Sequence, residues 1–155
     1  MAGRSPAKAL AAAVDRPVVV LCVGNSVRGD DGFGPAVAAR LGERADVIDA
    51  GTAPENELPR AARMGPRTVV LVDAVHFDGR DGEVRVIAPA DLRFDDFSTH
   101  AASLELCAQF LRETCGARTV LLAAQPVAVA FGDEMSSAIT AAVEEAATLL
   151  ETLLA

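Results

Sequence analysis

The sequence contains a single lysine, Lys8, and arginine carries the rest of its basic charge. Because Lys8 lies near the start of the chain, in a segment that we expect to be disordered, nothing favours a catalytic or Schiff-base lysine. Acidic residues outnumber basic ones, with 22 Asp and Glu against 14 Lys and Arg and a formal net charge of -8. This balance argues against a nucleic-acid partner and against binding to an acidic membrane surface.

Cysteines and long apolar runs are also scarce. The three cysteines, Cys22, Cys107 and Cys115, form an odd set without the spacing of a metal site, and they lie in apolar segments. We therefore expect reduced core thiols in a cytoplasmic protein. No apolar run reaches the length of a membrane span. The alanine-rich start is only weakly similar to a signal peptide, so we expect a disordered tail over residues 1–16 and one domain over residues 17–155.

Strand-like and helix-like segments alternate along the rest of the chain. Apolar, β-branched runs predict strands over Pro17–Val23, Ala45–Gly51, Arg67–Val75, Glu83–Pro89 and Arg118–Pro126. Helical spacing and capping residues predict helices over Phe33–Arg44, Pro54–Met64, Ser98–Gly116 and Met135–Leu154. The alternation predicts an α/β fold, a three-layer α/β/α sandwich around a mostly parallel sheet of about five strands, with one antiparallel strand.

A glycine-rich turn, GNSVRGDDGFG, follows the first expected strand and carries two adjacent aspartates. The turn lacks the dinucleotide fingerprint, the P-loop pattern and the nucleophile elbow. Asp30 and Asp31 would repel a phosphate, so a cation is the better guest for this turn. Asn25 and the glycines, Gly24 and Gly32 among them, are typical of a tight turn with positive backbone angles.

Further polar groups are expected at the same edge of the sheet. Asp49 ends the second strand, Asp73 ends the third, and His100 precedes the fifth. Because the carboxyl ends of parallel strands meet at one edge, these groups and Asp31 are expected to lie together. Two carboxylates and one imidazole suit a divalent transition-metal ion better than magnesium. His76, the other histidine, is a weaker candidate ligand.

Each of these residues also has a structural interpretation. Asp31 can favour the dipole of a helix start, and Asp30 can cap the same helix. Asp49 can hold a turn through its side chain. Asp73 can belong to a buried structural pair, since a carboxylate within a buried strand needs a partner. His100 can be a surface or capping histidine.

Five stretches taken in order, GNSVRGDDGFG, DAGTAPENE, VLVDA, STH and AAQP, resemble the hydrogenase maturation endopeptidases. The resemblance covers Val18 to Leu153 and is closest to the subgroup that matures the hydrogenase of formate hydrogenlyase. Cys22 stands where many members have the first glycine of G-x-G-N. Asp31 stands at a position that the family fills with Glu or Asp, and its shorter side chain would move the donor oxygen inward.

The resemblance implies an endopeptidase that removes the C-terminal extension of a nickel-loaded [NiFe] hydrogenase large-subunit precursor. It implies nickel ligands at Asp31, Asp73 and His100, with nickel recognised in the substrate rather than kept as a cofactor. Asp49 matches a further acidic residue near that site, so the candidate catalytic carboxylates are Asp31, Asp49 and Asp73. Either Asp49 or Asp31 could act as the base for an attacking water.

The resemblance also implies that Gly24, Asn25 and Gly32 shape the cleft beside the metal. We expect a monomer. Two alternatives stay open at this point: a non-catalytic chaperone for nickel or the large subunit on the same fold, and a protease of this fold with another substrate.

Overall fold

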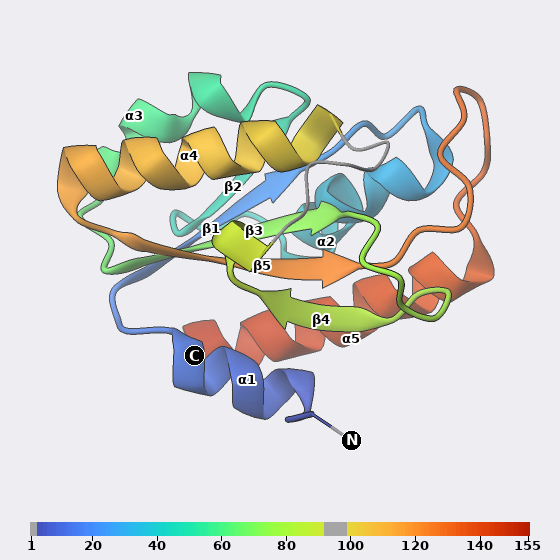
Figure 1. The fold of residues 1–155 in the computed structure, drawn as a ribbon, viewed down its shortest axis with the longest axis horizontal. Coiled ribbons are helices and arrows are strands. Elements are labelled where there is room, and N and C mark those ends of the chain that lie inside the picture. Colours follow the sequence, from blue (N-terminus) through green and yellow to red (C-terminus); the bar gives the residue numbers. More distant parts are fainter. Residues whose placement is uncertain (1–2, 92–98) are drawn as a thin grey trace.

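The computed structural model describes residues 3–91 and 99–155, except the side chains of residues 99–102. Its strands are β1 (Val18–Val23), β2 (Val47–Gly51), β3 (Thr68–Ala74), β4 (Val84–Ile87) and β5 (Arg118–Ala124). They form one five-stranded sheet in the order β2-β1-β3-β5-β4 (Figure 1). Within the described residues, only the β4–β5 pair is antiparallel. The predicted mostly parallel sheet with one antiparallel strand is therefore confirmed.

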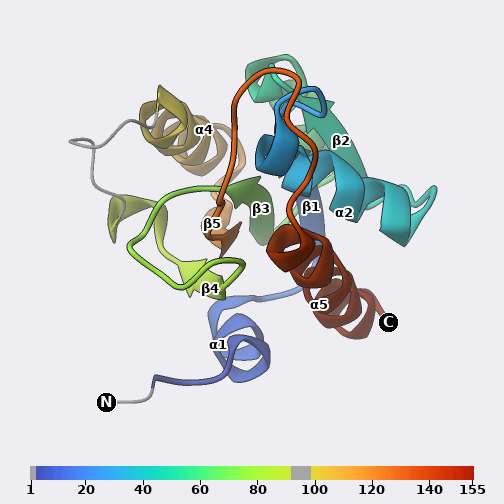
Figure 2. The same cartoon turned by 90° about the vertical axis from the view of Figure 1, so that its right-hand side faces the viewer.

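Helices cover both faces of this sheet. They are α1 (Pro6–Ala13), α2 (Phe33–Leu41), α3 (Leu58–Arg63), α4 (Thr99–Cys115) and α5 (Ser137–Leu154), with short 3-10 helices η1 (Gly29–Gly32), η2 (Pro54–Asn56) and η3 (Pro89–Asp91). Figure 1 shows α3 and α4 over one face, and Figure 2 shows α2 and α5 over the other. The predicted start of the α4 helix at Ser98 lies outside the described residues. No helix within the described ranges is long and apolar enough to cross a membrane.

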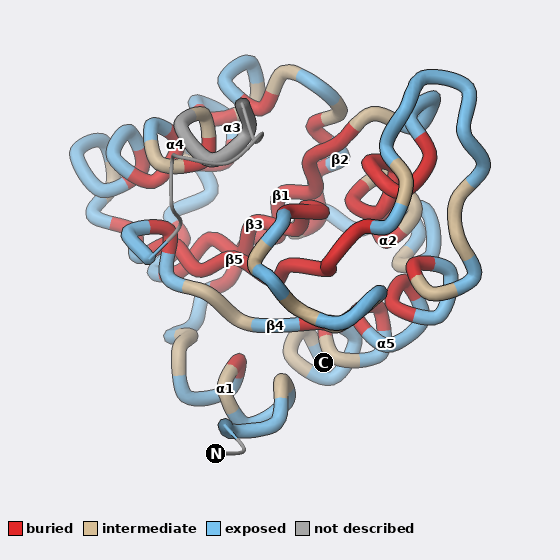
Figure 3. The backbone as a smooth tube through the Cα atoms, turned by 45° about the vertical axis from the view of Figure 1, so that its right-hand side comes forward, coloured by how far each residue is buried: buried red, intermediate tan, exposed pale blue. Residues whose placement is uncertain are grey.

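Alternation along the strands divides the core between the two faces. Leu21 and Leu71 are fully buried in the cluster under α3 and α4, whereas Val20 and Val70 are fully buried in the cluster under α2 and α5. Every residue of β1 and of β3 is buried, as the tube in Figure 3 shows. Continuous apolar runs are what a strand covered on both faces requires.

Helix α1 differs from the disordered tail predicted for residues 1–16. The Ser5 side chain caps it by accepting a hydrogen bond from the Lys8 backbone N–H at 3.3 Å, and a proline occupies its first turn. Leu10 is 2% exposed and belongs to the core cluster under α2 and α5. With one large apolar side chain among alanines, the segment has too weak a pattern to predict packing from sequence.

The strand order reverses direction at β1, and this reversal positions the site. The chain passes from β1 through α2 to β2, and then through α3 back across β1 to β3. Right-handed crossovers in opposite directions place α2 and α3 on opposite faces. The carboxyl ends of β1 and β3 therefore lie at a topological switch point, where α/β folds bind their ligands.

Candidate active site

A cavity of about 130 Å³ opens at the carboxyl ends of β1 and β3. The residues that line it come from β1 and its following turn, from the β2–η2 segment, from β3 and from α4: Val23, Gly24, Asn25, Arg28, Asp31, Thr52, Pro54, Asp73, Ser103 and Leu104. Two of the predicted carboxylates, Asp31 and Asp73, thus share one cavity at the predicted edge of the sheet. Gly24 and Asn25, predicted to shape the cleft, also line it.

The turn after β1 holds Asp31 in place. The Asn25 backbone N–H donates to a carboxylate oxygen of Asp31 at 3.1 Å and to its backbone oxygen at 3.0 Å. The Asn25 side chain in turn accepts from the Val27 backbone N–H at 3.0 Å, an Asx turn. Gly24 has a φ of 151°, and a Cβ there would overlap the Asp31 backbone oxygen. Only glycine fits this position, so the tight turn and the orientation of Asp31 depend on each other.

Gly32 plays a different part from Gly24. It does not line the cavity but ends η1 and precedes α2. A Cβ on Gly32 would lie 3.3 Å from Ser26 Cα, which is tighter than ordinary contact. Gly32 therefore shapes the turn behind the site rather than the wall of the cavity.

Asp73 enters the cavity from within the sheet. It is fully buried near the end of β3 and, by alternation, shares the α3/α4 face with Leu71. Its negative charge also affects Cys22 in the neighbouring strand β1. Burial raises the pKa of the Cys22 thiol to about 12, and the negative charges of Asp49 and Asp73 add to the effect. Cys22 is therefore a neutral core thiol, as predicted.

The structure does not bring Asp49 together with the other two carboxylates. Asp49 is exposed in β2, between the buried Ile48 and Ala50. Its carboxylate accepts from the Gly51 backbone N–H at 3.3 Å, the turn contact that was its structural alternative. Asp49 lines a separate cavity beside α2, together with Arg60. Asp49 does lie at the predicted edge of the sheet. It does not reach the cavity, because its side chain points to the other face of the sheet.

The two histidines, His100 and His76, lie in different parts of the structure. His100 lies in the first turn of α4, and its side chain is outside what the structure describes. Ser103 of the same helix does line the cavity. His76 is exposed after β3, and its Nδ1 lies 3.0 Å from the Gln125 side-chain nitrogen. His76 does not line the cavity. Among the described residues, no group of three His, Cys, Asp or Glu side chains is placed to hold a metal ion, so the ligand set stays a prediction.

Asp30 has a role that the sequence did not predict. It is fully buried, and its carboxylate accepts hydrogen bonds from the backbone N–H groups of Val127 and Ala128 at 2.8 and 3.1 Å. It also accepts from the Ser136 backbone N–H at 2.7 Å and hydroxyl at 2.9 Å. Ser136 is the N-cap of α5. Asp30 therefore holds the loop between β5 and α5, instead of capping α2 as expected.

These contacts determine the ionisation of Asp30. Burial alone would raise the pKa of this carboxyl, but the backbone donors and the Ser136 hydroxyl outweigh it. The pKa is lowered from its ordinary value of 3.8. The buried carboxylate is thus ionised at neutral pH.

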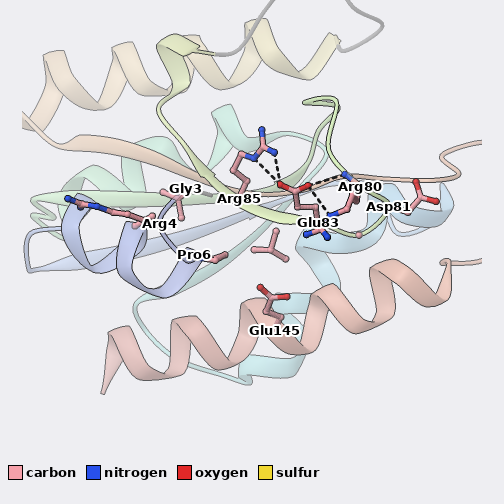
Figure 4. A pocket seen from close by; sticks show the side chains of 12 residues that line it. Gly3, Arg4, Pro6, Arg80, Asp81, Glu83, Arg85 and Glu145 are labelled. Carbon is pink, nitrogen blue, oxygen red and sulfur yellow. Dashed lines mark hydrogen bonds and ion pairs between the residues drawn. The ribbon is translucent and has the colours of Figure 1, made fainter. Parts of the chain in front are cut away.

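A larger cavity lies elsewhere, between α1, β4 and α5, with a volume of about 850 Å³ (Figure 4). Three of its charged side chains form ion pairs, Glu83 with Arg80 and with Arg85. Glu83 accepts from the Arg80 backbone N–H at 3.0 Å and from the Arg85 guanidinium at 2.5 and 3.1 Å. These bonds lower the pKa of Glu83. None of the predicted site residues lines this cavity, and its size alone does not make it the active site.

Known proteins match both the sequence and the fold. The family model described as "Hydrogenase maturation protease" matches residues 36–153. The "Hydrogenase 3 maturation protease" of Escherichia coli (strain K12) is 36% identical over 138 residues, which are 86% of this chain and 88% of the relative. A "Putative hydrogenase maturation protease" of Methanocaldococcus jannaschii is 27% identical over 128 residues, 75% of this chain and 76% of the relative.

Solved structures agree. A [NiFe] hydrogenase maturation protease from Thermococcus kodakarensis superposes with a TM-score of 0.79 at 35% identity, covering 88% of this chain and 91% of that one. The solution structure of an Escherichia coli endopeptidase superposes with a TM-score of 0.75 at 33% identity, covering 89% of this chain and 91% of that one.

The fold and the cavity define the class: an α/β protein with two carboxylates, Asp31 and Asp73, at the switch point of its sheet. The chain belongs to the hydrogenase maturation protease family, and it is therefore a peptidase. The family predicted from the sequence is confirmed, and the relatives named for hydrogenase 3 agree with the predicted subgroup. The family match begins at residue 36, so it contains Asp73 but not Asp31.

Proposed function

We propose that this chain is an endopeptidase that removes the C-terminal extension of a [NiFe] hydrogenase large-subunit precursor carrying nickel. The observation that carries the proposal is the pairing of Asp31 and Asp73 in one cavity at the switch point. Membership of a family of hydrogenase maturation proteases supports the substrate class. The net charge of -8 supports a monomer, since self-repulsion opposes association.

Asp31 is the better candidate for the base. It is 8% exposed at the cavity wall, whereas Asp73 is fully buried. The Asn25 backbone N–H orients the Asp31 carboxylate, which can take a proton from a water that attacks the peptide carbonyl. Asp49 lies outside the cavity, so the alternative base is not supported by this geometry.

Arg28 is the basic residue among the described side chains that line the cavity. Its guanidinium can donate to the oxygen of the attacked carbonyl, where negative charge develops. The cavity then combines a candidate base, Asp31, and a cation, Arg28. Neither serine nor cysteine is needed as a nucleophile, and both core thiols, Cys22 and Cys107, have raised pKa values because they are buried.

Nickel enters this scheme as part of the substrate. Asp31 and Asp73 would supply two oxygen donors, and the imidazole of His100, at the start of a helix that reaches the cavity, would supply a nitrogen. A three-ligand set of this kind leaves a position open for groups of the precursor. Nickel insertion would then be checked before the extension is removed.

The test is the release of a C-terminal peptide from a purified nickel-loaded precursor, measured by mass spectrometry. The wild-type protein should release one peptide of defined mass. The Asp73→Asn variant, which keeps the shape of the side chain, should release none. Equal release by both proteins would remove Asp73 from the mechanism, and no release by wild type would refute the proposed function.

A further inference from the structure

Exposed apolar side chains gather in two loops beside the candidate site. Seven large apolar side chains are exposed in the described part of the chain, and four of them lie here. They are Val27 at 52%, Val127 at 51%, Val129 at 39% and Phe131 at 76% exposure. Single exposed apolar residues are ordinary, but a gathered set marks an interaction surface. We call these four residues the Val27–Phe131 patch.

The two loops are joined to each other. The Gly132 backbone N–H donates to the Val27 backbone oxygen at 2.9 Å, and the Asp30 N–H donates to the Ala128 oxygen at 2.8 Å. Figures 1 and 2 both show the loop between β5 and α5 beside the turn after β1. Cross-loop bonds therefore hold the two loops that carry the four exposed side chains side by side.

The patch is also tied to the candidate site. The Asp30 carboxylate binds the Val127 N–H and the start of α5, so it holds the second loop against η1. Asp31, the next residue, lines the cavity, and so does Arg28, the neighbour of Val27. A partner seated on the patch would thus be held at a fixed position relative to Asp31.

The size of the cavity explains why such a surface is needed. Its volume of about 130 Å³ is well below the roughly 300–1,000 Å³ of typical small-molecule pockets. It can hold a few atoms around the scissile bond but not the body of a protein. Affinity for a protein substrate must come from area outside the cavity, centred on large apolar anchors with a polar rim. Phe131 supplies such an anchor, and the exposed Asp133 and Glu134 supply a rim.

We propose that the Val27–Phe131 patch is the surface on which an apolar face of the folded large-subunit precursor docks, outside the segment that is removed. This inference rests on the proposed function. Docking here would place the junction of the C-terminal extension over Asp31. The patch would act on recognition of the substrate and leave the chemical step unchanged.

The experiment compares wild type with Phe131→Ser and with the control Met64→Ser. Met64 is an apolar residue, 37% exposed, at the end of α3, beside the amino end of the sheet. Binding of the nickel-loaded precursor is measured by biolayer interferometry, and cleavage by mass spectrometry across a range of precursor concentrations. Because Phe131 is exposed, its replacement should leave the melting temperature unchanged.

Phe131→Ser should weaken binding and raise KM at least tenfold, with kcat within about twofold of wild type. Met64→Ser should match wild type in all three quantities. Unchanged binding and KM in Phe131→Ser, with wild type active, would overturn the docking proposal and leave the proposed function standing. A wild type that neither binds nor cleaves the precursor would overturn both. A dimer that Phe131→Ser converts to a monomer, seen by light scattering, would assign the patch to a second copy and also overturn the proposal.

Discussion

Asp30 and Ser136 are joined by two hydrogen bonds, from the serine N–H at 2.7 Å and from its hydroxyl at 2.9 Å. This pair connects the turn after β1 to the start of α5, with Asp30 fully buried and Ser136 half-buried. We predict that Asp30→Asn lowers the free energy of unfolding by about 1–3 kcal/mol, because four hydrogen-bond donors lose the charged acceptor that the buried Asp30 supplies. Urea denaturation at pH 7 measures the change.

The loss should depend on pH. The folded pKa of Asp30 is lowered, so its contribution is present above the unfolded value near 3.8 and disappears as pH falls through the folded pKa. The difference between wild type and Asp30→Asn should therefore shrink below pH 4. Asp133→Asn is the control, since that exposed carboxylate accepts one loop N–H, from Ala130 at 2.9 Å. A constant difference between pH 7 and pH 3 would contradict the assignment.

Asp31 and Asp49 should respond differently to the same substitution. Asp31→Asn removes the proposed base and should lower processing at least a hundredfold. Asp49→Asn changes a carboxylate on the other face of the sheet and should keep processing within about threefold of wild type. Initial rates with a nickel-loaded precursor test both. An inactive Asp49→Asn protein with a normal melting curve would return Asp49 to the mechanism.

Helix α1 should contribute to stability. Leu10 is 2% exposed in the core, so Leu10→Ala should lower the free energy of unfolding by about 2 kcal/mol or more. Leu106→Ala makes the same chemical change at a side chain that is 65% exposed, and it should have little effect. Thermal melting of the two variants checks this. Equal melting temperatures would mean that α1 does not pack as described.

The thiols should react in the order of their burial. Burial raises the pKa of Cys22 to about 12 and that of Cys107 to about 11, with nearby carboxylates adding to both. Cys115 is only partly buried. Iodoacetamide at pH 8 should label Cys115 in the folded protein, and the other two only after unfolding. Peptide mapping would contradict this if Cys22 were labelled under native conditions.

The sheet could be predicted because its signals are local. Each strand is a short apolar run, and the parallel arrangement follows from alternation with helices. Because ligands bind at the carboxyl ends of parallel strands, the strand directions alone predicted that Asp31 and Asp73 lie together, and both line the cavity. Asp49 also lies at this edge of the sheet, but its side chain is on the opposite face. Whether a strand-end residue points into a site depends on the face to which its position in the strand turns the side chain, and a shift of one position reverses that face.

Other features depend on partners that are distant in sequence. Asp30 contacts Val127 and Ser136, which are 97 and 106 positions away in the sequence. No spacing pattern in the sequence predicts such contacts. The packing of Leu10 likewise needs the finished core. Gly24 was recognisable as a turn residue, but its contact with Asp31 required coordinates.

The nickel check is tested most directly by comparing cleavage of nickel-loaded and nickel-free precursor by the wild-type protein, with the released peptide weighed by mass spectrometry. We expect release of one C-terminal peptide from the nickel-loaded precursor and none from the nickel-free form, because in the proposed mechanism Asp31 and Asp73 bind the substrate through its metal. Cleavage of both forms at equal rates would contradict the metal check and leave a peptidase that recognises its substrate by other contacts.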